Sequence, residues 1–320
     1  MADLSGSNVT SRVSNSTTGD ETSLTIPVRV SLIFNITVNT ITCPLTFLLN
    51  VLVIMAVKRR PRLQSKANIL LACLAVTDAL SGLVVQPAFI MWMTSKLLDM
   101  PGKSTIIAFV NSSARATFVC SSLHLMLVTL ERLIAIKFTM QYPNIVTTQN
   151  IKVVVTSFWI TTFSSEVTRF ARDQYVFSNV LAALVLTSCV VFIAFSYVIL
   201  YHETRRQEKK IKSQQLPKEE VERFAKESKA LKTTVYVVGA VVLCFVPAAA
   251  LLLISSLLKV SGAWMQIRLS SLYYVFTPAI RTCGLLNSLL NPLIYCWRQR
   301  EMRKFVLSRF SAVHEVHPTA

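Results

Sequence analysis

Residues 177–201 read FSNVLAALVLTSCVVFIAFSYVILY, a run of 25 positions that contains no Asp, Glu, Lys, Arg or His. A helix of about 20 apolar residues crosses the roughly 30 Å hydrocarbon core of a bilayer. Lipid offers the backbone no hydrogen bonds, so an isolated spanning segment of this kind is a helix rather than a strand. The stretch therefore predicts a transmembrane helix.

Six further apolar blocks flank this stretch. They cover residues 30–57, 69–94, 104–137, 151–170, 233–258 and 269–297. Ser and Thr residues dilute the block at 151–170, but helical hydroxyls can bond to neighbouring backbone and helices, so it remains a predicted span. Charged residues make up 15% of the chain, against about 25% in soluble domains. The predicted fold class is an all-α membrane protein, a seven-transmembrane helix bundle.

Basic residues predict how the bundle is oriented. Of the 33 Lys and Arg residues, 23 fall on one side, mostly within 58–66, 205–232 and 298–309. Short loops rich in Lys and Arg stay in the cytoplasm. We therefore expect a multi-pass plasma-membrane protein with its N-terminus outside.

We expect four parts in order: an extracellular tail, the bundle of seven membrane-spanning helices, an amphipathic eighth helix (helix 8) on the cytoplasmic side, and a short cytoplasmic tail. These parts cover 1–28, 29–297, 298–310 and 311–320. Asn8 and Asn15 lie in Asn-x-Ser/Thr sequons of the outer tail and are candidate glycosylation sites. The net charge of +17 follows largely from the orientation signal, so it calls for anionic membrane lipid rather than nucleic acid as a partner.

Polar residues inside predicted spans are costly and mark candidate functional positions. Asp78 is the acidic residue nearest the middle of any span, with Ser121 and Asn287 at similar depth. A lone carboxylate among hydroxyls and amides suits a small cation such as Na⁺. The alternative is a protonated Asp78 in a hydrogen-bonded network. No cofactor is expected beyond this possible allosteric Na⁺.

A second group of residues is typical of a conformational switch. Glu131-Arg132 ends the third span, and Glu227 begins the sixth on the same side, where it could pair with Arg132. Such a pair would hold the cytoplasmic face closed. Pro247 and Pro292 interrupt the sixth and seventh spans and should kink them.

These residues together resemble the class A (rhodopsin-like) G-protein-coupled receptors over about 30–310. The matching positions are Asn50 in LLNVLV, Asp78 in LAVTD, Glu131-Arg132-Leu133, Trp159, Tyr197, Cys244-Phe245-Val246-Pro247 and Asn291-Pro292-Leu293-Ile294-Tyr295. The resemblance implies an outer agonist pocket, an outward swing of the sixth helix, and a heterotrimeric G protein docking near Arg132, Tyr197 and Tyr295.

Some positions depart from the family pattern. Leu133 and Phe245 replace its usual aromatic and Trp. Ile107 stands where the family usually has a disulfide Cys, the connection 171–176 has no Cys, and Cys189 stands where the fifth span usually has Pro. These features place the chain nearest the melanocortin, cannabinoid, lysophospholipid and adenosine-like branch.

The resemblance also bears on the ligand. Ala114 stands where amine receptors carry Asp, and Leu285 where opsins carry the retinal Lys. Arg115 and Arg281 could clamp a carboxylate or phosphate; alternatively, each snorkels outward or pairs with Glu166 or Asp173. We expect an extracellular small-molecule or lipid ligand. The candidate ligand-binding residues are Arg115, Arg281, Phe118, Phe245, Tyr274 and Thr277.

Two other functions compete with a signalling receptor. One is a non-signalling binding or dimerisation partner of the same fold, which Leu133 and Phe245 leave open. The other is a transporter or channel, which the single central Asp78 supports poorly. The four His residues are not grouped at metal-ligand spacing, and no nucleophile–base pair is visible, so no enzyme is expected.

Overall fold

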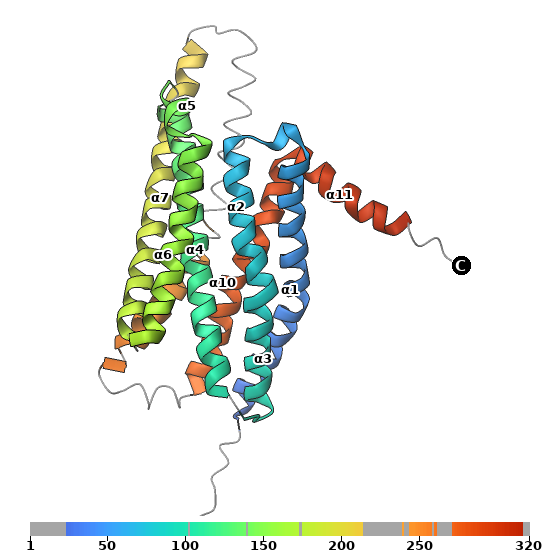
Figure 1. Cartoon of the computed structure of the whole chain (residues 1–320), viewed down its shortest axis with the longest axis vertical. Helices are drawn as coiled ribbons and strands as arrows, with labels where there is room; N and C mark the ends of the chain where they lie inside the picture. The colour runs from blue at the N-terminus through green and yellow to red at the C-terminus, as the bar shows by residue number, and fades with distance from the viewer. Residues whose placement is uncertain are drawn as a thin grey trace, which may run out of the picture.

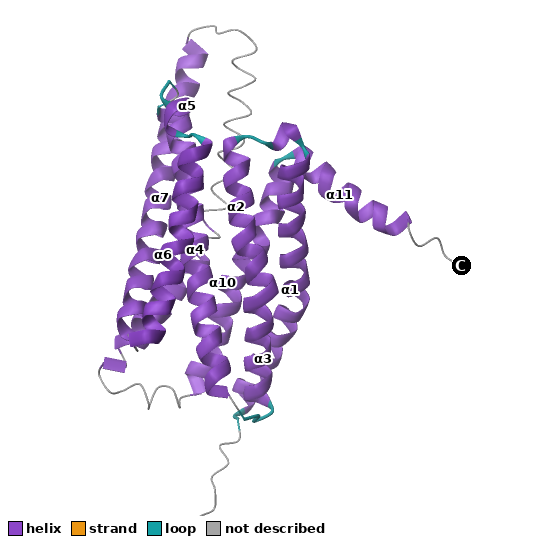
Figure 2. Cartoon of the chain, viewed as in Figure 1, coloured by secondary structure: helices purple, strands orange, loops and turns teal. Residues whose placement is uncertain are grey.

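The computed structural model describes residues 24–101, 103–138, 140–172, 175–213, 243–257 and 271–315, together with positions 239 and 259–260. Helices form almost all of these segments, and none of the described residues lies in a β-strand (Figure 2). The expected all-α class is confirmed.

Each predicted span corresponds to a helix. They are α1 (Ile26–Arg59), α2 (Lys66–Leu80) continued by α3 (Gln86–Leu97), α4 (Lys103–Lys137), α6 (Thr148–Arg172), α7 (Tyr175–Ser213), the helix Leu243–Leu257, and α10 (Ser271–Arg298). By length and composition, four of the described helices are apolar enough to cross a membrane: α1, the combined α2–α3, α4 and α7. The more polar α6 agrees with the hydroxyl-rich sequence of 151–170.

Helix α1 buries polar side chains within the bundle and exposes large apolar side chains on its outer surface. On α1, Asn35, Asn39 and Asn50 are at most 1% exposed, whereas Ile33 and Phe34 are 52% and 65% exposed. Water-soluble helices show the reverse arrangement, because their apolar stripe faces the core. This reversal is what a helix surrounded by lipid requires.

Helix α1 packs against α2, α3 and α10, while α4 packs against α2, α6 and α7, so that α4 lies within the bundle (Figure 1). A close approach of α1 and α2–α3 depends on Gly82. A Cβ atom at this position would lie 2.8 Å from the backbone nitrogen of Phe47. The Cys43 thiol donates a hydrogen bond to the Gly82 carbonyl at 3.1 Å. Gly82 lies in a π-helical turn, η2 (Ser81–Val85), that separates α2 from α3.

An amphipathic helix follows the seventh span, as the sequence predicts. Helix α11 (Arg300–Glu315) begins two residues later and ends five residues later than the predicted 298–310. Met302, Phe305 and Val306 are at most 5% exposed, and α11 packs against α1 and α10. It leaves the bundle at the end opposite the start of α1 (Figure 1), an arrangement that suits a helix lying on a membrane face.

Candidate functional site

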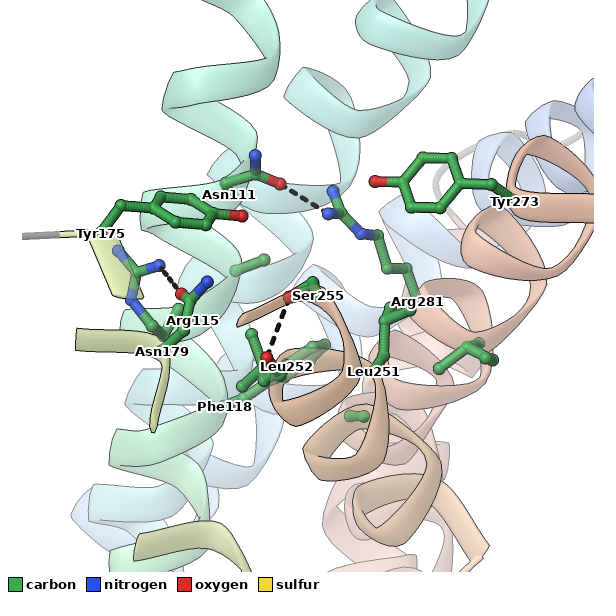
Figure 3. Close-up of a pocket in the computed structure, with 13 residues that line it drawn as sticks. Asn111, Arg115, Phe118, Tyr175, Asn179, Leu251, Leu252, Ser255, Tyr273 and Arg281 are labelled. Atoms are coloured by element: carbon green, nitrogen blue, oxygen red, sulfur yellow. Dashed lines mark hydrogen bonds between the residues drawn. The ribbon is translucent and has the colours of Figure 1, made fainter. Parts of the chain in front are cut away.

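A pocket opens between α4, α7, α10 and the helix Leu243–Leu257. Its lining residues are Asn111, Ala114, Arg115, Phe118, Tyr175, Asn179, Ala248, Leu251, Leu252, Ser255, Tyr273, Ile280 and Arg281. Figure 3 shows Asn111, Tyr273 and the Arg281 guanidinium together on one side. Small and apolar side chains form much of the remaining wall. The pocket therefore has a polar side and an apolar side, as a binding site for an amphiphilic molecule requires.

Arg115 lines this pocket, but its guanidinium is held by neighbouring residues. Its Nε and Nη2 donate to the two carboxylate oxygens of Glu166 at 2.8 and 2.6 Å, and its Nη1 donates to Asn179 Oδ1 at 2.8 Å. Arg169 forms a second ion pair with the same carboxylate at 3.3 Å and donates to Ser112 Oγ. Of the alternatives left open by the sequence, the structure therefore shows pairing of Arg115 with Glu166.

Arg281 is in a different environment. Its Nη2 donates to Asn111 Oδ1 at 2.5 Å, and its guanidinium carbon lies 5.9 Å from the centre of the Trp92 ring. Its Nη1 is buried without a hydrogen-bond partner among the described residues. No described carboxylate lies within ion-pair distance of it.

Phe118 packs against two neighbours beneath the pocket. Its ring meets Phe245 edge-to-face, with 6.3 Å between ring centroids. It also lies so close to Gly284 that a Cβ atom there would be 2.8 Å from its Cζ. Glycine is thus required at 284 if the ring is to keep this position.

The other predicted ligand residues do not line the pocket. Phe245 is 1% exposed and lies under Phe118, Thr277 is 2% exposed, and Tyr274 packs under the Lys96 ammonium at 4.5 Å. Asn111, Tyr175 and Asn179 line the pocket but were not predicted from the sequence as ligand-binding residues. The presence of Asn111 and Asn179 within predicted spans was the signal that could have indicated them.

The residues predicted around Asp78 lie close together. Asp78 is fully buried; its Oδ2 accepts from Asn291 Nδ2 at 2.7 Å and its Oδ1 from Ser121 Oγ at 3.4 Å. Asn287 is also buried, but its Nδ2 has no partner among the described residues. Asn50 joins this group through Nδ2, which donates to the Ser288 carbonyl at 3.0 Å. A small cation would find its oxygen ligands on the Oδ1 side of Asp78.

Near the C-terminal end of α4, Glu131 contacts both Arg132 and a residue that the sequence did not indicate. Arg132 Nε lies 3.4 Å from Glu131 Oε2, an ion pair without hydrogen-bond geometry. Tyr142, in the short helix α5 (Tyr142–Ile145), donates through Oη to Glu131 Oε1 at 2.7 Å. Burial and the bond to Glu131 raise the Tyr142 pKa to about 12. The phenol therefore remains a donor at neutral pH.

The remaining switch residues lie on α7, α10 and the helix Leu243–Leu257. Tyr295 is 6% exposed, and its Oη has no hydrogen-bond partner among the described residues, while Tyr197 packs against the hydrophobic core. Pro247 lies within the helix Leu243–Leu257 and Pro292 within α10. Glu227 and the sequons at Asn8 and Asn15 lie outside the described residues.

The seven cysteines are free thiols in the structure. They are Cys43, Cys73, Cys120, Cys189, Cys244, Cys283 and Cys296. The closest pair described is Cys244 and Cys283, whose sulfur atoms are 3.8 Å apart. With Ile107 at the usual Cys position, α4 is held to α6 by the Arg115–Glu166 ion pair and by the hydrogen bond from Arg169 to Ser112 Oγ.

The fold is that of a membrane protein with a pocket lined by Arg115 of α4 and a charged pair, Glu131 and Arg132, nearer the C-terminal end of the same helix. The sequence pattern of the family described as "7 transmembrane receptor (rhodopsin family)" matches residues 49–177 and 162–295. These matches cover most of the chain, which therefore belongs to this family and is a G-protein-coupled receptor.

Similar proteins include receptors for chemically different ligands. Sphingosine 1-phosphate receptor 2 of Rattus norvegicus is 25% identical, with 81% of this chain and 71% of the relative aligned. The 5-hydroxytryptamine receptor 1B of Equus caballus is 25% identical, with 88% and 86% aligned. Adenosine receptor A2a of Homo sapiens is 25% identical, with 87% and 72% aligned. All three are receptors, so the non-signalling alternative is not favoured. The lipid and adenosine receptors are compatible with the expected branch.

Proposed function

We propose that this receptor lies in the plasma membrane with its N-terminus outside. In this proposal an extracellular small ligand, anionic or lipid-like, binds in the pocket of Figure 3 and activates a heterotrimeric G protein. The observation that carries the proposal is that α4 joins the two sites. Arg115 lines the pocket, and Arg132 lies near the C-terminal end of the same helix. The two residues are 17 positions apart and thus roughly 26 Å along the helix axis at 1.5 Å per residue. Displacement of one uninterrupted helix would reach both ends.

The pocket's chemistry supports an anionic ligand group. The Arg281 guanidinium has a buried N–H without a described partner, and an unpaired buried charge is unfavourable until an anion compensates it. Among the relatives, sphingosine 1-phosphate receptor 2 is named for a lipid that carries a phosphate. Ala114 leaves the pocket without a carboxylate where an amine receptor would carry one.

The contacts of Glu131 support a closed cytoplasmic face in this structure. Glu131 holds Arg132 and accepts from Tyr142, so the Arg132 side chain is directed to its own helix. An agonist that binds an open state more tightly would shift the population toward it. In that state Arg132, Tyr197 and Tyr295 would contact the G protein. Pro247 would be the pivot of the sixth helix, and Pro292 would bend the seventh. A pair between Arg132 and Glu227 remains a prediction.

An allosteric Na⁺ at Asp78 is part of the proposal. Carboxylate and hydroxyl oxygens are ligands that hard cations favour, and Asp78 Oδ1 and Ser121 Oγ are 3.4 Å apart. Asn287, whose buried Nδ2 has no described partner, is the third residue that we assign to this site. The bound ion would stabilise the arrangement in which Asn291 contacts Asp78.

Nucleotide exchange tests the proposed coupling. The full-length receptor is assayed with a panel of purified heterotrimeric G proteins, as wild type and as Arg132→Ala. A rise in exchange that requires wild-type receptor supports coupling. Absence of exchange on the whole panel, without ligand and with a broad library of anionic and lipid ligands, would favour a non-signalling binding protein. Receptor abundance and thermal stability of Arg132→Ala serve as folding controls.

A further inference from the structure

The outer pocket offers a ligand one uncommitted positive charge in its interior. Arg281 contributes it, because Nη2 is bound to a neutral amide, Asn111, and Nη1 is buried without a described partner. Figure 3 shows the Tyr273 hydroxyl directed toward the same guanidinium. Among the described residues, the neighbours of this guanidinium are an amide, a phenol and the Trp92 ring, and none of them carries a negative charge.

The second cation of the pocket, Arg115, is already paired with a carboxylate that it shares with Arg169. Arg115 is 4% exposed and forms a two-point pair with Glu166, while Asn179 accepts from its third nitrogen. Such forked pairs are the strongest class of charged hydrogen bonds. A ligand would have to displace Glu166 before it could use Arg115, so Arg115 does not supply charge to the ligand.

The shape and charge of the Arg281 guanidinium indicate which class of anion it would bind. Guanidinium is a planar fork that matches the two oxygens of a carboxylate. A phosphate monoester carries about −1.5 to −2 charges at neutral pH, so one buried guanidinium would leave part of that charge uncompensated in a region of low dielectric. An ammonium ligand would be repelled. Opposite Arg281, the apolar wall of Phe118, Leu251 and Leu252 suits a hydrocarbon or aromatic body.

We infer that the pocket binds a carboxylate amphiphile of single negative charge, with its carboxylate on Arg281 and its apolar body over Phe118. This inference rests on the receptor function proposed above and names the ligand class of its site. It also separates this chain from the relatives named for a phosphate lipid, an amine and a nucleoside.

One further cation lies at the rim and must be included in the test. The Lys259 ammonium lies 4.4 Å from the centre of the Tyr175 ring, and Tyr175 lines the pocket. Lys259 is exposed, and its charge is screened by water. If Lys259 joined Arg281 in binding, the two together would suit a phosphate.

The test uses three probes that share one apolar body: 4-phenylbutanoate, 4-phenylbutyl phosphate and 4-phenylbutan-1-amine. Their binding to purified full-length receptor is measured as a shift in thermal unfolding, which needs no G protein. We expect the carboxylate to bind most tightly. Arg281→Gln should weaken it by at least about tenfold, as loss of a charge-assisted bond does. Lys259→Gln, the matched control, should leave it within about twofold, as for a screened surface charge.

A folding control is available in the unliganded protein. Because Arg281 lacks a described counter-ion, Arg281→Gln should unfold at the wild-type temperature or higher; a markedly lower temperature would contradict the uncompensated charge. Tighter binding of the phosphate, tighter binding of the amine, or no binding of the carboxylate would overturn the inference. Carboxylate binding without nucleotide exchange would instead support the ligand class and contradict the proposed coupling. Nucleotide exchange driven only by ligands of another class would support the proposed coupling and contradict the carboxylate ligand class.

Discussion

Replacing Glu166 with Gln should destabilise the receptor, because this carboxylate is the shared partner of Arg115 and Arg169. Side-chain exposure is 4% for Arg115, 10% for Arg169 and 13% for Glu166, so water replaces little of the lost interaction. Removing one partner of a buried ion pair costs about 3–5 kcal/mol. Gln keeps one acceptor oxygen, so we take the lower end, about 3 kcal/mol. At about 2 °C per kcal/mol, the unfolding temperature should fall by roughly 6 °C.

Thermal unfolding of purified Glu166→Gln in lipid nanodiscs measures this change. The matched control is Glu203→Gln. The Glu203 carboxylate lies 3.9 Å from Arg206, and the two side chains are 34% and 68% exposed, respectively. The unfolding temperature of this variant should be close to that of the wild type. Adding Arg115→Gln to Glu166→Gln should restore part of the loss, because one uncompensated charge is then removed. If Glu166→Gln behaved like Glu203→Gln, the Arg115–Glu166 ion pair would not hold α4 to α6, and our account of the absent family disulfide would be wrong.

Three further substitutions test other contacts. Gly284→Ala should displace the Phe118 ring, since the new methyl would lie 2.8 Å from its Cζ. The displacement should cost about 1–3 kcal/mol of unfolding free energy or of ligand-binding free energy. If the unfolding temperature and the ligand affinity were both unchanged, this packing would be contradicted. Tyr142→Phe should raise basal nucleotide exchange roughly fivefold. It removes the 2.7 Å hydrogen bond to Glu131, which stabilises the closed state by about 1 kcal/mol. Unchanged or lower exchange would show that the bond does not favour the closed state. Asp78→Asn should abolish any effect of Na⁺, tested against K⁺ at equal ionic strength, on ligand affinity; a Na⁺ effect that survives would place the ion elsewhere.

The helices could be predicted because the bilayer imposes their length. Residues 177–201 satisfy that requirement on composition alone, and the structure has α7 there. The buried polar residues Asp78, Asn50 and Asn291 could be predicted for the same reason, since a polar group retained in lipid has to face the interior. The hydroxyl-rich α6 was the least certain span and is the one that supplies Glu166.

The partners of individual side chains could not be predicted. Arg115 and Glu166 are 51 positions apart, and their contact depends on how α4 and α6 are rotated about their axes. Apolar and hydroxyl-bearing residues are mixed around the circumference of α4 and α6, so the sequence pattern constrains rotation weakly. Tyr274 and Thr277 were assigned to the pocket for this reason, whereas the neighbouring Tyr273 lines it together with the predicted Arg281. The bond from Tyr142 to Glu131 depends on the short helix α5, which carries no apolar periodicity to indicate it.

Mapping which side of the membrane each end of the chain faces tests the central claim most directly. Of the described helices, α6 and α10 are not among those apolar enough by composition to cross a membrane, yet the proposed signalling requires both to cross. An epitope tag at the N-terminus should bind antibody on intact cells, and a tag after Ala320 only after permeabilisation. Detection of both tags on the same face of the membrane would contradict an odd number of spans, and with it the separation of an outer pocket from a cytoplasmic Arg132.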